Sequence, residues 1–352
     1  IAGGGTPSTP AGTNNIDFAT IASTGNFSDF GDFITTGFAR IAVANTTRGV
    51  FFGKAIAPSS TNHIEFITIA ATGNSVDFGD LVESKHTMGA AGNSTRGIAV
   101  GGNPSSGTMN YVTISTTGNA ADFGDCTVAI WNTRGGNCGN AVRGLMAGGE
   151  PGSSNAIQFV TISTLGNTVD FGDRTVTKSQ IAHLSSTTRA VFAGAGEGDN
   201  DTIDYVQIMS TGNAADFGNL TVSRTFCSGT SSATRGLTVG GVDSPATVNV
   251  IDFTTIASAG DAQDFGDLLG VKASVGALSS TTRAVFGGGY SVSNPSAATN
   301  DITSLTIATT GNSADFGDLT IARRYLNGVS SNTRGVFGSG SVPAANNTID
   351  FI

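Results

Sequence analysis

The chain carries the phrase Asp-Phe-Gly seven times, and this repetition limits its possible folds more than any other feature. The first Asp of each copy follows the start of an apolar, Thr-rich segment at one constant offset, as Asp29 follows Ile16. These segments start at Ile16, Ile64, Met109, Ile157, Ile203, Ile251 and Ile302. A nearly constant period of this length indicates a repeat architecture in which each unit packs against its neighbours.

A second anchor is an Arg followed by Gly or Ala, which lies at a constant offset from the start in six repeats and slightly later in the third. The anchor residues are Arg48, Arg96, Arg143, Arg189, Arg235, Arg283 and Arg334. The third repeat departs from the pattern around Trp131. The remaining length variation lies between this Arg and the next start, in a stretch rich in Gly, Pro, Ser and Asn. Length change is therefore confined almost entirely to one loop per repeat.

Each repeat predicts four short β-strands. In the last full repeat these strands are 302–308, 314–321, 325–331 and 334–337, and no window shows helical periodicity. Four strands in a unit of this length form one blade of a β-propeller, and seven units complete a ring. We predict an all-β, seven-bladed β-propeller formed by residues 1–352 as a single domain. The partial repeats 1–15 and 349–352 lie at the closure, where N- and C-terminal strands share a blade.

The order of signals within each repeat resembles the kelch family. A strand of small residues precedes a strand that ends in Gly-Gly, as at Val239-Gly240-Gly241, and an aromatic-bearing strand follows, as at Ile203-Asp204-Tyr205. A basic residue opens the next unit, as at Arg224, Lys272 and Arg323. The chain departs from the family in carrying the Phe of Asp-Phe-Gly where kelch units usually have Trp. The resemblance implies kelch-like four-stranded blades.

The repeated sequence Thr-Gly-Asn-Ala-x-Asp-Phe-Gly-Asp-Leu-Thr is similar to repeats in virion structural proteins of marine tailed phages, cyanophages among them. This resemblance implies a place in a tail fibre or another virion appendage. It also implies a virion or extracellular localisation. The expected partners are other virion proteins and host-surface glycans or proteins.

The charge balance argues against two other classes of partner. The formal net charge is −9, and only 12% of the residues are charged. Nucleic acids and anionic membrane surfaces require clustered cations, so we expect neither as a partner. No apolar run is long enough for a membrane-spanning helix. Because residue 1 is Ile and no signal-peptide pattern follows it, we expect the chain to be processed or part of a longer polypeptide.

The repeated residues are interpreted as the frame of the fold. The seven aromatic residues, predicted to fill the space between adjacent blades, are Phe30, Phe78, Phe123, Phe171, Phe217, Phe265 and Phe316. The Gly permits a turn or a close backbone approach, and the Asp caps backbone amides. The anchor Arg is predicted to form one ion pair or charge-assisted hydrogen bond with an Asp in each blade. A ring of Arg that binds an anion at the central channel is the alternative. A kinase-type metal motif is excluded, because seven copies occur without a phosphate loop or a catalytic loop.

We predict no catalytic residue, cofactor or metal. The three histidines lie at different offsets in their repeats, so no symmetry brings them together; they are His63, His86 and His183. One cluster of acidic residues is formed by Glu197, Asp199, Asp201 and Asp204. We interpret it as a solvated loop, and a calcium site is the alternative. Cys126, Cys138 and Cys227 are interpreted as buried free thiols, and a Cys126–Cys138 pair is the alternative.

The variable loops are the predicted binding site. They run over 54–63, 103–108, 150–156, 195–202, 242–250, 290–301 and 341–348. In a propeller these loops emerge on the same face as the connections between blades. Together with the irregular third repeat, they supply the candidate residues Asn103, Glu150, Asp199, Asp201, Asp243, Tyr290 and Trp131. We predict a non-enzymatic virion structural or receptor-binding module. A propeller enzyme acting on polysaccharide, a bacterial surface adhesin and a pure assembly protein are the alternatives.

Overall fold

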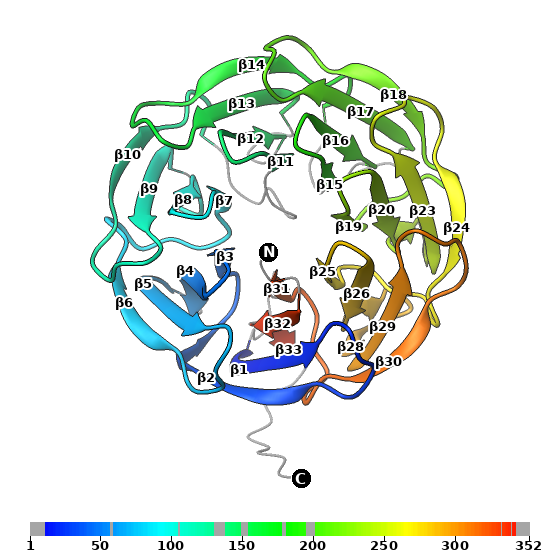
Figure 1. Cartoon of the computed structure of the whole chain (residues 1–352), viewed down its shortest axis with the longest axis horizontal. Helices are drawn as coiled ribbons and strands as arrows, with labels where there is room; N and C mark the ends of the chain where they lie inside the picture. The colour runs from blue at the N-terminus through cyan, green and yellow to red at the C-terminus, as the bar shows by residue number, and fades with distance from the viewer. Residues whose placement is uncertain are drawn as a thin grey trace.

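The computed structural model describes residues 11–56, 59–104, 106–129, 138–148, 154–177, 181–194, 201–331, 333–338 and 340–342. Seven four-stranded antiparallel sheets surround a central axis as blades (Figure 1). Within the described ranges there are strands and turns and no helix. The predicted all-β, seven-bladed β-propeller is confirmed.

Each blade is named here by its order around the ring, and its strands are given from the axis outwards. Blade 1 contains β3 (Ile41–Ala44), β4 (Arg48–Ile56), β5 (Ser59–Thr68) and β6 (Val76–Asp80). Blade 2 contains β7 (Gly89–Gly92), β8 (Arg96–Val100), β9 (Thr108–Thr113) and β10 (Ala121–Asp125). Blade 3 contains β11 (Cys138–Gly139), β12 (Arg143–Ala147), β13 (Ala156–Thr161) and β14 (Val169–Asp173). Blade 4 contains β15 (Ala182–Ser185), β16 (Arg189–Ala193), β17 (Thr202–Gln207) and β18 (Ala215–Asn219).

Blades 5 and 6 each carry an additional two-stranded hairpin between their second and third strands. Blade 5 contains β19 (Ser228–Ser231), β20 (Arg235–Val239), β23 (Val250–Thr255) and β24 (Gln263–Asp267), with the hairpin β21 (Val242–Asp243) and β22 (Ala246–Thr247). Blade 6 contains β25 (Gly276–Ser279), β26 (Arg283–Gly287), β29 (Asp301–Thr306) and β30 (Ala314–Asp318), with the hairpin β27 (Tyr290–Ser291) and β28 (Asn294–Ala298).

Blade 7 closes the ring with strands from both ends of the chain, as predicted. Its inner strands are β31 (Asn327–Ser330) and β32 (Arg334–Gly338), and its outer strands are β1 (Ala11–Thr20) and β2 (Ser28–Gly37). The register of β1 against β32 runs from Ile16 opposite Gly338 to Thr20 opposite Arg334. The short strand β33 (Ser341–Val342) pairs with the start of β1. Backbone hydrogen bonds therefore join the two ends within one sheet.

The hydrophobic core lies in the seams between blades. In the seam between blades 1 and 2, Phe52 and Phe78 from blade 1 share a cluster with Val112 from blade 2. Both faces of a blade are covered by neighbours, and this is why consecutive residues of the second strand, such as Ile98, Ala99 and Val100, are all buried. The Phe of every Asp-Phe-Gly phrase is buried in this core.

The Asp-Phe-Gly phrase forms the outermost strand of each blade and attaches it to the next one. In blade 1, the Phe78 carbonyl accepts the Gly118 amide at 2.7 Å, and the Asp80 amide donates to Asn119 Oδ1 at 3.1 Å. A Cβ on Gly79, whose φ is +143°, would lie 2.5 Å from the Gly118 carbonyl carbon. The same amide-to-Phe bond recurs at all seven seams. It covers the outer sheet edges, which would otherwise be open for pairing with other chains.

The anchor arginines also link neighbouring blades, but the predicted pairing with Asp is wrong. Arg96 Nη1 donates to the Ile162 carbonyl of the next blade at 2.9 Å, and its guanidinium lies 4.6 Å from the centre of the Tyr111 ring. All seven arginines donate to such a carbonyl, and the acceptors are those of Ile114, Ile162, Ile208, Ile256, Ile307, Ile21 and Ile69. None of them belongs to an ion pair within the described part of the chain.

Candidate binding face

Two sets of connecting segments meet on one face of the ring, here called the connection face. In five blades, the segment that arrives from the previous blade forms an isolated β-bridge with the end of the second strand or with the segment that follows it. The bridges are Phe38 to Ala55, His86 to Asn103, Thr225 to Val242, Ala273 to Tyr290 and Arg324 to Ser341. The loops that vary in length therefore emerge on the same face as the blade connections.

A strained backbone position recurs along this face. Ala39, Thr87, Phe226, Ser274 and Tyr325 have φ between 52° and 59°, a left-handed conformation that non-glycine residues seldom adopt. Hydrogen bonds run from one of these residues to the next: the Tyr325 amide donates to the Ser274 carbonyl at 3.3 Å, and the Ser274 amide donates to the Phe226 carbonyl at 3.1 Å. Sequence patterns did not reveal this position, because Gly and Asn, the usual signals for it, are absent from it.

The hairpins of blades 5 and 6 touch each other and form one unit, here called the hairpin pair (242–247 and 290–298). The Val292 amide donates to Thr247 Oγ1 at 2.7 Å, and the base of the pair packs on a cluster that includes Val242, Tyr290 and Tyr325. The tips are exposed, and they consist of Ser244, Pro245, Ala246, Ser293 and Asn294. The hairpin pair thus combines a packed base with exposed, mainly small and polar tips.

The predicted binding residues occupy different parts of this face. Asp243 and Tyr290 lie in the two hairpins, where Tyr290 is buried 5.7 Å from the Tyr325 ring. Asn103 lies in blade 2, and Asp201 precedes β17 in blade 4, so the structure does not bring these two together with the hairpin pair. Glu150, Asp199 and Trp131 lie outside the described residues.

Buried ion pairs join the blade connections to the third strands near this face. In blade 5, Arg224 Nη2 lies 2.9 Å from Asp252 Oδ2, and the same guanidinium donates to the carbonyls of Val250 and Thr238. Arg323 and Asp17 form the equivalent pair in blade 7 and so join the two ends of the chain. The repeated basic residues Arg224 and Arg323, which open their units, therefore have a structural role.

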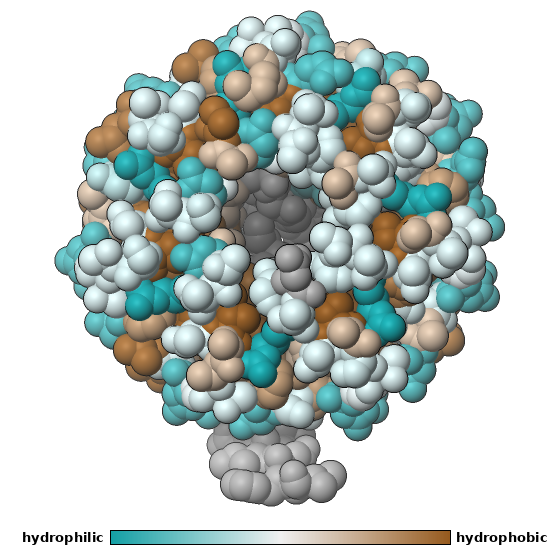
Figure 2. Space-filling model, in the orientation of Figure 1, coloured by the Kyte–Doolittle hydropathy of each residue, from teal (hydrophilic) through white to brown (hydrophobic). Residues whose placement is uncertain are grey.

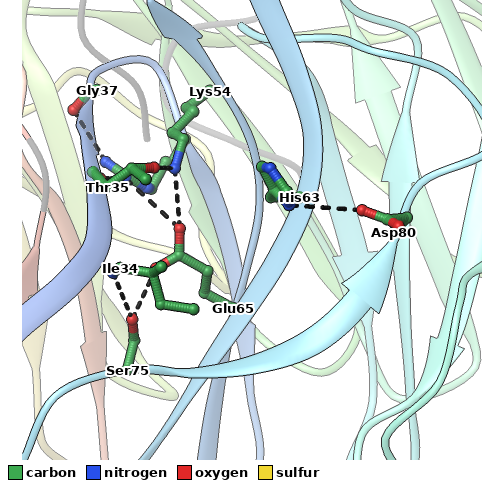
Figure 3. A network of polar contacts seen from close by, with 9 residues as sticks. Ile34, Thr35, Gly37, Lys54, His63, Glu65, Ser75 and Asp80 are labelled. Carbon is green, nitrogen blue, oxygen red and sulfur yellow. Dashed lines mark hydrogen bonds and ion pairs between the residues drawn. The ribbon is translucent and has the colours of Figure 1, made fainter.

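Blade 1 contains a larger network of this kind (Figure 3). The Glu65 carboxylate accepts hydrogen bonds from Lys54 at 3.0 Å, from the Ser75 hydroxyl at 2.6 Å and from the Ile34 amide at 3.0 Å. Burial raises the pKa of Glu65, but the charges of Arg40 and Lys54 and the Ser75 hydrogen bond outweigh it, so the pKa is lowered overall. Lys54 is 1% exposed, so its amine is sealed from substrates despite a pKa lowered by burial and by Arg40.

The channel holds a cavity of about 280 Å³ between the inner strands. Its lining is mainly small and apolar, as at Ala42 and Ala90, and its polar members are Asn140, Arg143 and Ser185. Figure 2 shows the hollow at the centre of the ring, surrounded mostly by residues of intermediate hydropathy. Across the described residues, no group of three His, Cys, Asp or Glu side chains is arranged to hold a metal ion.

The three cysteines are buried and unpaired, so the alternative of a Cys126–Cys138 disulfide is wrong. Burial raises the pKa of both Cys126 and Cys138 to about 12. Thiols with such a high pKa are poor nucleophiles at neutral pH, because the thiolate is the reactive form. These cysteines therefore act as small apolar residues of the seams.

Comparison with known proteins adds no family to this description. No protein-family model matches the sequence, and no curated protein matches it at a significant level. None of the described residues forms a helix long and apolar enough to cross a membrane. The fold and the face together define a seven-bladed β-propeller whose variable loops lie on one face.

Proposed function

We propose that this chain is a non-enzymatic binding module of a virion appendage, which presents its connection face to a glycan or protein on the host surface. The observation that carries the proposal is that repeated residues and variable segments occupy different parts of the ring. The seven Phe side chains that recur with the repeat are buried in the seams, and the recurring anchor Arg residues donate to carbonyls of the next blade, whereas the segments that differ between repeats meet on one face. Loops on a rigid scaffold are the usual place for recognition.

The hairpin pair is the proposed centre of that contact. Its tips are exposed, and its base is fixed by the contact between Val292 and Thr247 and by the packing of Tyr290. A fixed backbone lowers the entropy lost on binding, and small polar side chains suit hydrogen bonding to sugars or protein surfaces. The virion assignment rests on the resemblance of the repeats to phage structural proteins.

A cell-binding assay tests this proposal. The labelled protein is incubated with marine cyanobacterial cells and with their extracted surface polysaccharides, and the bound fraction is measured for the wild type and for Ala246→Arg and Asn294→Arg. Both substitutions place a long charged side chain at an exposed tip of the hairpin pair. We expect each to reduce binding about tenfold or more, because a bulky charge at a contact surface removes more than about 1.4 kcal/mol.

Thr117→Arg is the matched control, because Thr117 is exposed in the turn after β9, on the opposite face of the ring. Its binding is expected to equal that of the wild type. Equal binding by all four proteins, or loss in Thr117→Arg alone, would reject the connection face as the contact surface. Release of sugar fragments from the polysaccharide would instead support the alternative of a propeller enzyme.

A further inference from the structure

The face of the ring opposite to the connection face, here called the turn face, carries three exposed apolar side chains in neighbouring turns. Each blade contributes to this face the turn between its first and second strands and the turn between its third and fourth strands, since antiparallel strands place alternate turns at opposite ends. Val142 is 47% exposed, Leu165 is 57% exposed and Met209 is 53% exposed, and all three lie in such turns of blades 3 and 4. Apolar side chains that gather on a surface mark interaction sites.

The fold does not require apolar residues at these three positions. The residue directly before the anchor Arg is Val142 in the third repeat and Thr in the other six. The position of Leu165 holds Thr or Ala in the other repeats, and the position of Met209 holds Ala or Ser. The three large side chains therefore distinguish blades 3 and 4 from the rest of the turn face.

The turns that carry these side chains meet at one anchor arginine. Val142 directly precedes Arg143, and its carbonyl accepts the amide of Ile162 at 2.8 Å, at the start of the turn that contains Leu165. Arg143 Nη1 donates to the carbonyl of Ile208 at 3.1 Å, and the next residue along the chain is the exposed methionine. A single guanidinium is thus tied to the turns of both blades.

This guanidinium has no acidic partner. Arg143 is half-buried, stacks on the Phe159 ring at 4.3 Å, and belongs to no ion pair within the described part of the chain. The four turns that blades 3 and 4 contribute to the turn face, 140–142, 162–168, 186–188 and 208–214, contain no Asp or Glu. In a chain of net charge −9, this part of the turn face is therefore locally positive.

The combination of one cation and three apolar groups specifies the chemistry of a partner. A guanidinium is matched best by a carboxylate, which accepts two of its N–H groups at once. The apolar side chains require apolar groups, which a polysaccharide built from hydroxyl-bearing rings does not supply as large side chains. Arg and Met are also enriched in the centres of protein interfaces. A protein segment that carries both acidic and large apolar residues satisfies both requirements.

We propose that Val142, Arg143, Leu165 and Met209, here called the blade 3–4 patch, bind a protein segment in which Asp or Glu lies beside Leu, Ile or Phe. The carboxylate of the segment pairs with Arg143, and its apolar side chains cover the three exposed ones. A ring docked through this patch keeps its connection face open. The inference does not depend on the proposed host contact, because that contact uses the opposite face.

Selection from a random peptide display library on the wild-type protein tests the proposal. We expect the enriched peptides to carry acidic residues beside large apolar ones, because the patch offers a cation among apolar groups. Failure to enrich any peptide, or enrichment of peptides without acidic residues, would overturn the proposal. This step uses the wild type alone, so it is independent of how any variant folds.

The enriched peptides are then titrated against the variant Val142→Thr/Leu165→Thr/Met209→Ala by fluorescence anisotropy. The variant introduces residues that other repeats carry at the same positions, so its Tm is expected to equal that of the wild type. Its affinity for the peptides is expected to fall about tenfold or more. An affinity equal to that of the wild type would place the peptides elsewhere and reject the patch.

A matched control removes three other exposed apolar side chains. Ile34, Val82 and Leu269 follow the Asp-Phe-Gly phrase at one position, and four repeats have Thr there. The triple substitution of these residues by Thr is expected to leave peptide affinity unchanged. A loss equal to that of the patch variant would show that the peptides respond to exposed apolar area in general, and this would also reject the patch.

The charge requirement is tested at equivalent positions of two blades. Ala141 and Ala233 are both exposed, and each lies two residues before its anchor Arg, but only Ala141 belongs to the turn of the patch. Ala141→Glu is expected to weaken peptide binding about tenfold by competing for Arg143, whereas Ala233→Glu is expected to have no effect. Equal effects of the two substitutions would contradict the pairing with Arg143. Heparin is titrated in parallel, and heparin binding that Ala141→Glu abolishes but the triple patch variant retains would assign the site to an anionic glycan instead.

Discussion

At the scale of single residues, the aromatic ring of the Asp-Phe-Gly phrase contributes most to the packing of the seams. Phe171 is 2% exposed and lies edge-on to Phe159 at 5.8 Å in the seam between blades 3 and 4. Phe171→Ala is expected to lower the free energy of unfolding by about 3–5 kcal/mol, because it leaves a cavity in a packed seam. Urea unfolding measures the loss. Val169→Ala, at an exposed position of the same strand, is the control, and an equal loss there would contradict the packing role.

The glycine of the phrase is required by close backbone approach. A Cβ on Gly79 would meet the Gly118 carbonyl carbon at 2.5 Å, whereas a Cβ on Gly270 would meet no atom within 4 Å. We expect Gly79→Ala to cost about 2 kcal/mol or more, since the backbone at this φ is also strained for alanine. Gly270→Ala is expected to change stability by less than about 0.5 kcal/mol. Similar denaturation midpoints for the two variants would show that the blades do not approach as closely as described.

The stacking of the anchor arginines can be measured because one repeat lacks the aromatic residue. Arg96 stacks on Tyr111, but the corresponding residue in blade 6 is Ser304, so Arg283 keeps its hydrogen bond to the Ile21 carbonyl without the ring. Arg96→Ala should therefore cost about 0.5–2 kcal/mol more than Arg283→Ala, the difference being the cation–π contribution. Chemical denaturation of the two variants provides the comparison. A larger loss in Arg283→Ala would reject this account.

Glu65 predicts an acid-dependent loss of stability. Its pKa is lowered in the folded state from 4.5, so its contribution is present above pH 4.5 and is lost as the pH falls through the lower folded value. Glu65→Gln removes the carboxylate that pairs with Lys54 and Arg40 in the buried network, which costs about 3–5 kcal/mol at neutral pH. Because the wild-type carboxyl becomes protonated in acid, the difference between the two proteins should shrink from about pH 7 to about pH 3. A difference that stays constant over this range would contradict the buried ion pair.

At the scale of elements, the sequence predicted strands and their order, but not what each anchor contacts. The constant offset between the segment start and Asp-Phe-Gly predicted the third and fourth strands, because a hairpin of constant length tolerates no insertion. The acceptor of Arg96 is the Ile162 carbonyl, 66 residues away. Backbone carbonyls occur at every residue, so no side-chain pattern identifies this one. The prediction chose Asp instead, because opposite charges at fixed offsets suggest pairing.

The sequence predicted which loops form the candidate site, but not the contacts that hold these loops together. Loop length placed Asp243 and Tyr290 in variable segments, and both lie in the hairpins of the connection face. The contact between Thr247 and Val292 joins loops of different blades and leaves no periodic signal. The left-handed conformation of Tyr325 was also hidden, since tertiary hydrogen bonds impose it against residue preference.

At the scale of the whole molecule, the ring separates the residues that hold the fold from the segments that we propose for recognition. The outer hydrogen bonds of the Asp-Phe-Gly strands, the carbonyl contacts of the arginines and the shared blade 7 link each blade to the next around the ring. Such a closed frame tolerates changes in one loop, because that loop contributes little to the seams. The central claim is that residues which recur hold the ring, and residues which differ face a partner.

A stability scan of all single substitutions, read out as protease resistance of the folded chain, tests this claim most directly. The account predicts seven sensitive positions at the Phe of the phrase, seven at its Gly and seven at the anchor Arg, recurring with the repeat. It predicts tolerance at the exposed tips of the hairpin pair, Ser244 to Ala246 and Ser293 to Asn294. Sensitivity at the tips equal to that of the seven Phe positions, or sensitivity without the period of the repeat, would contradict it.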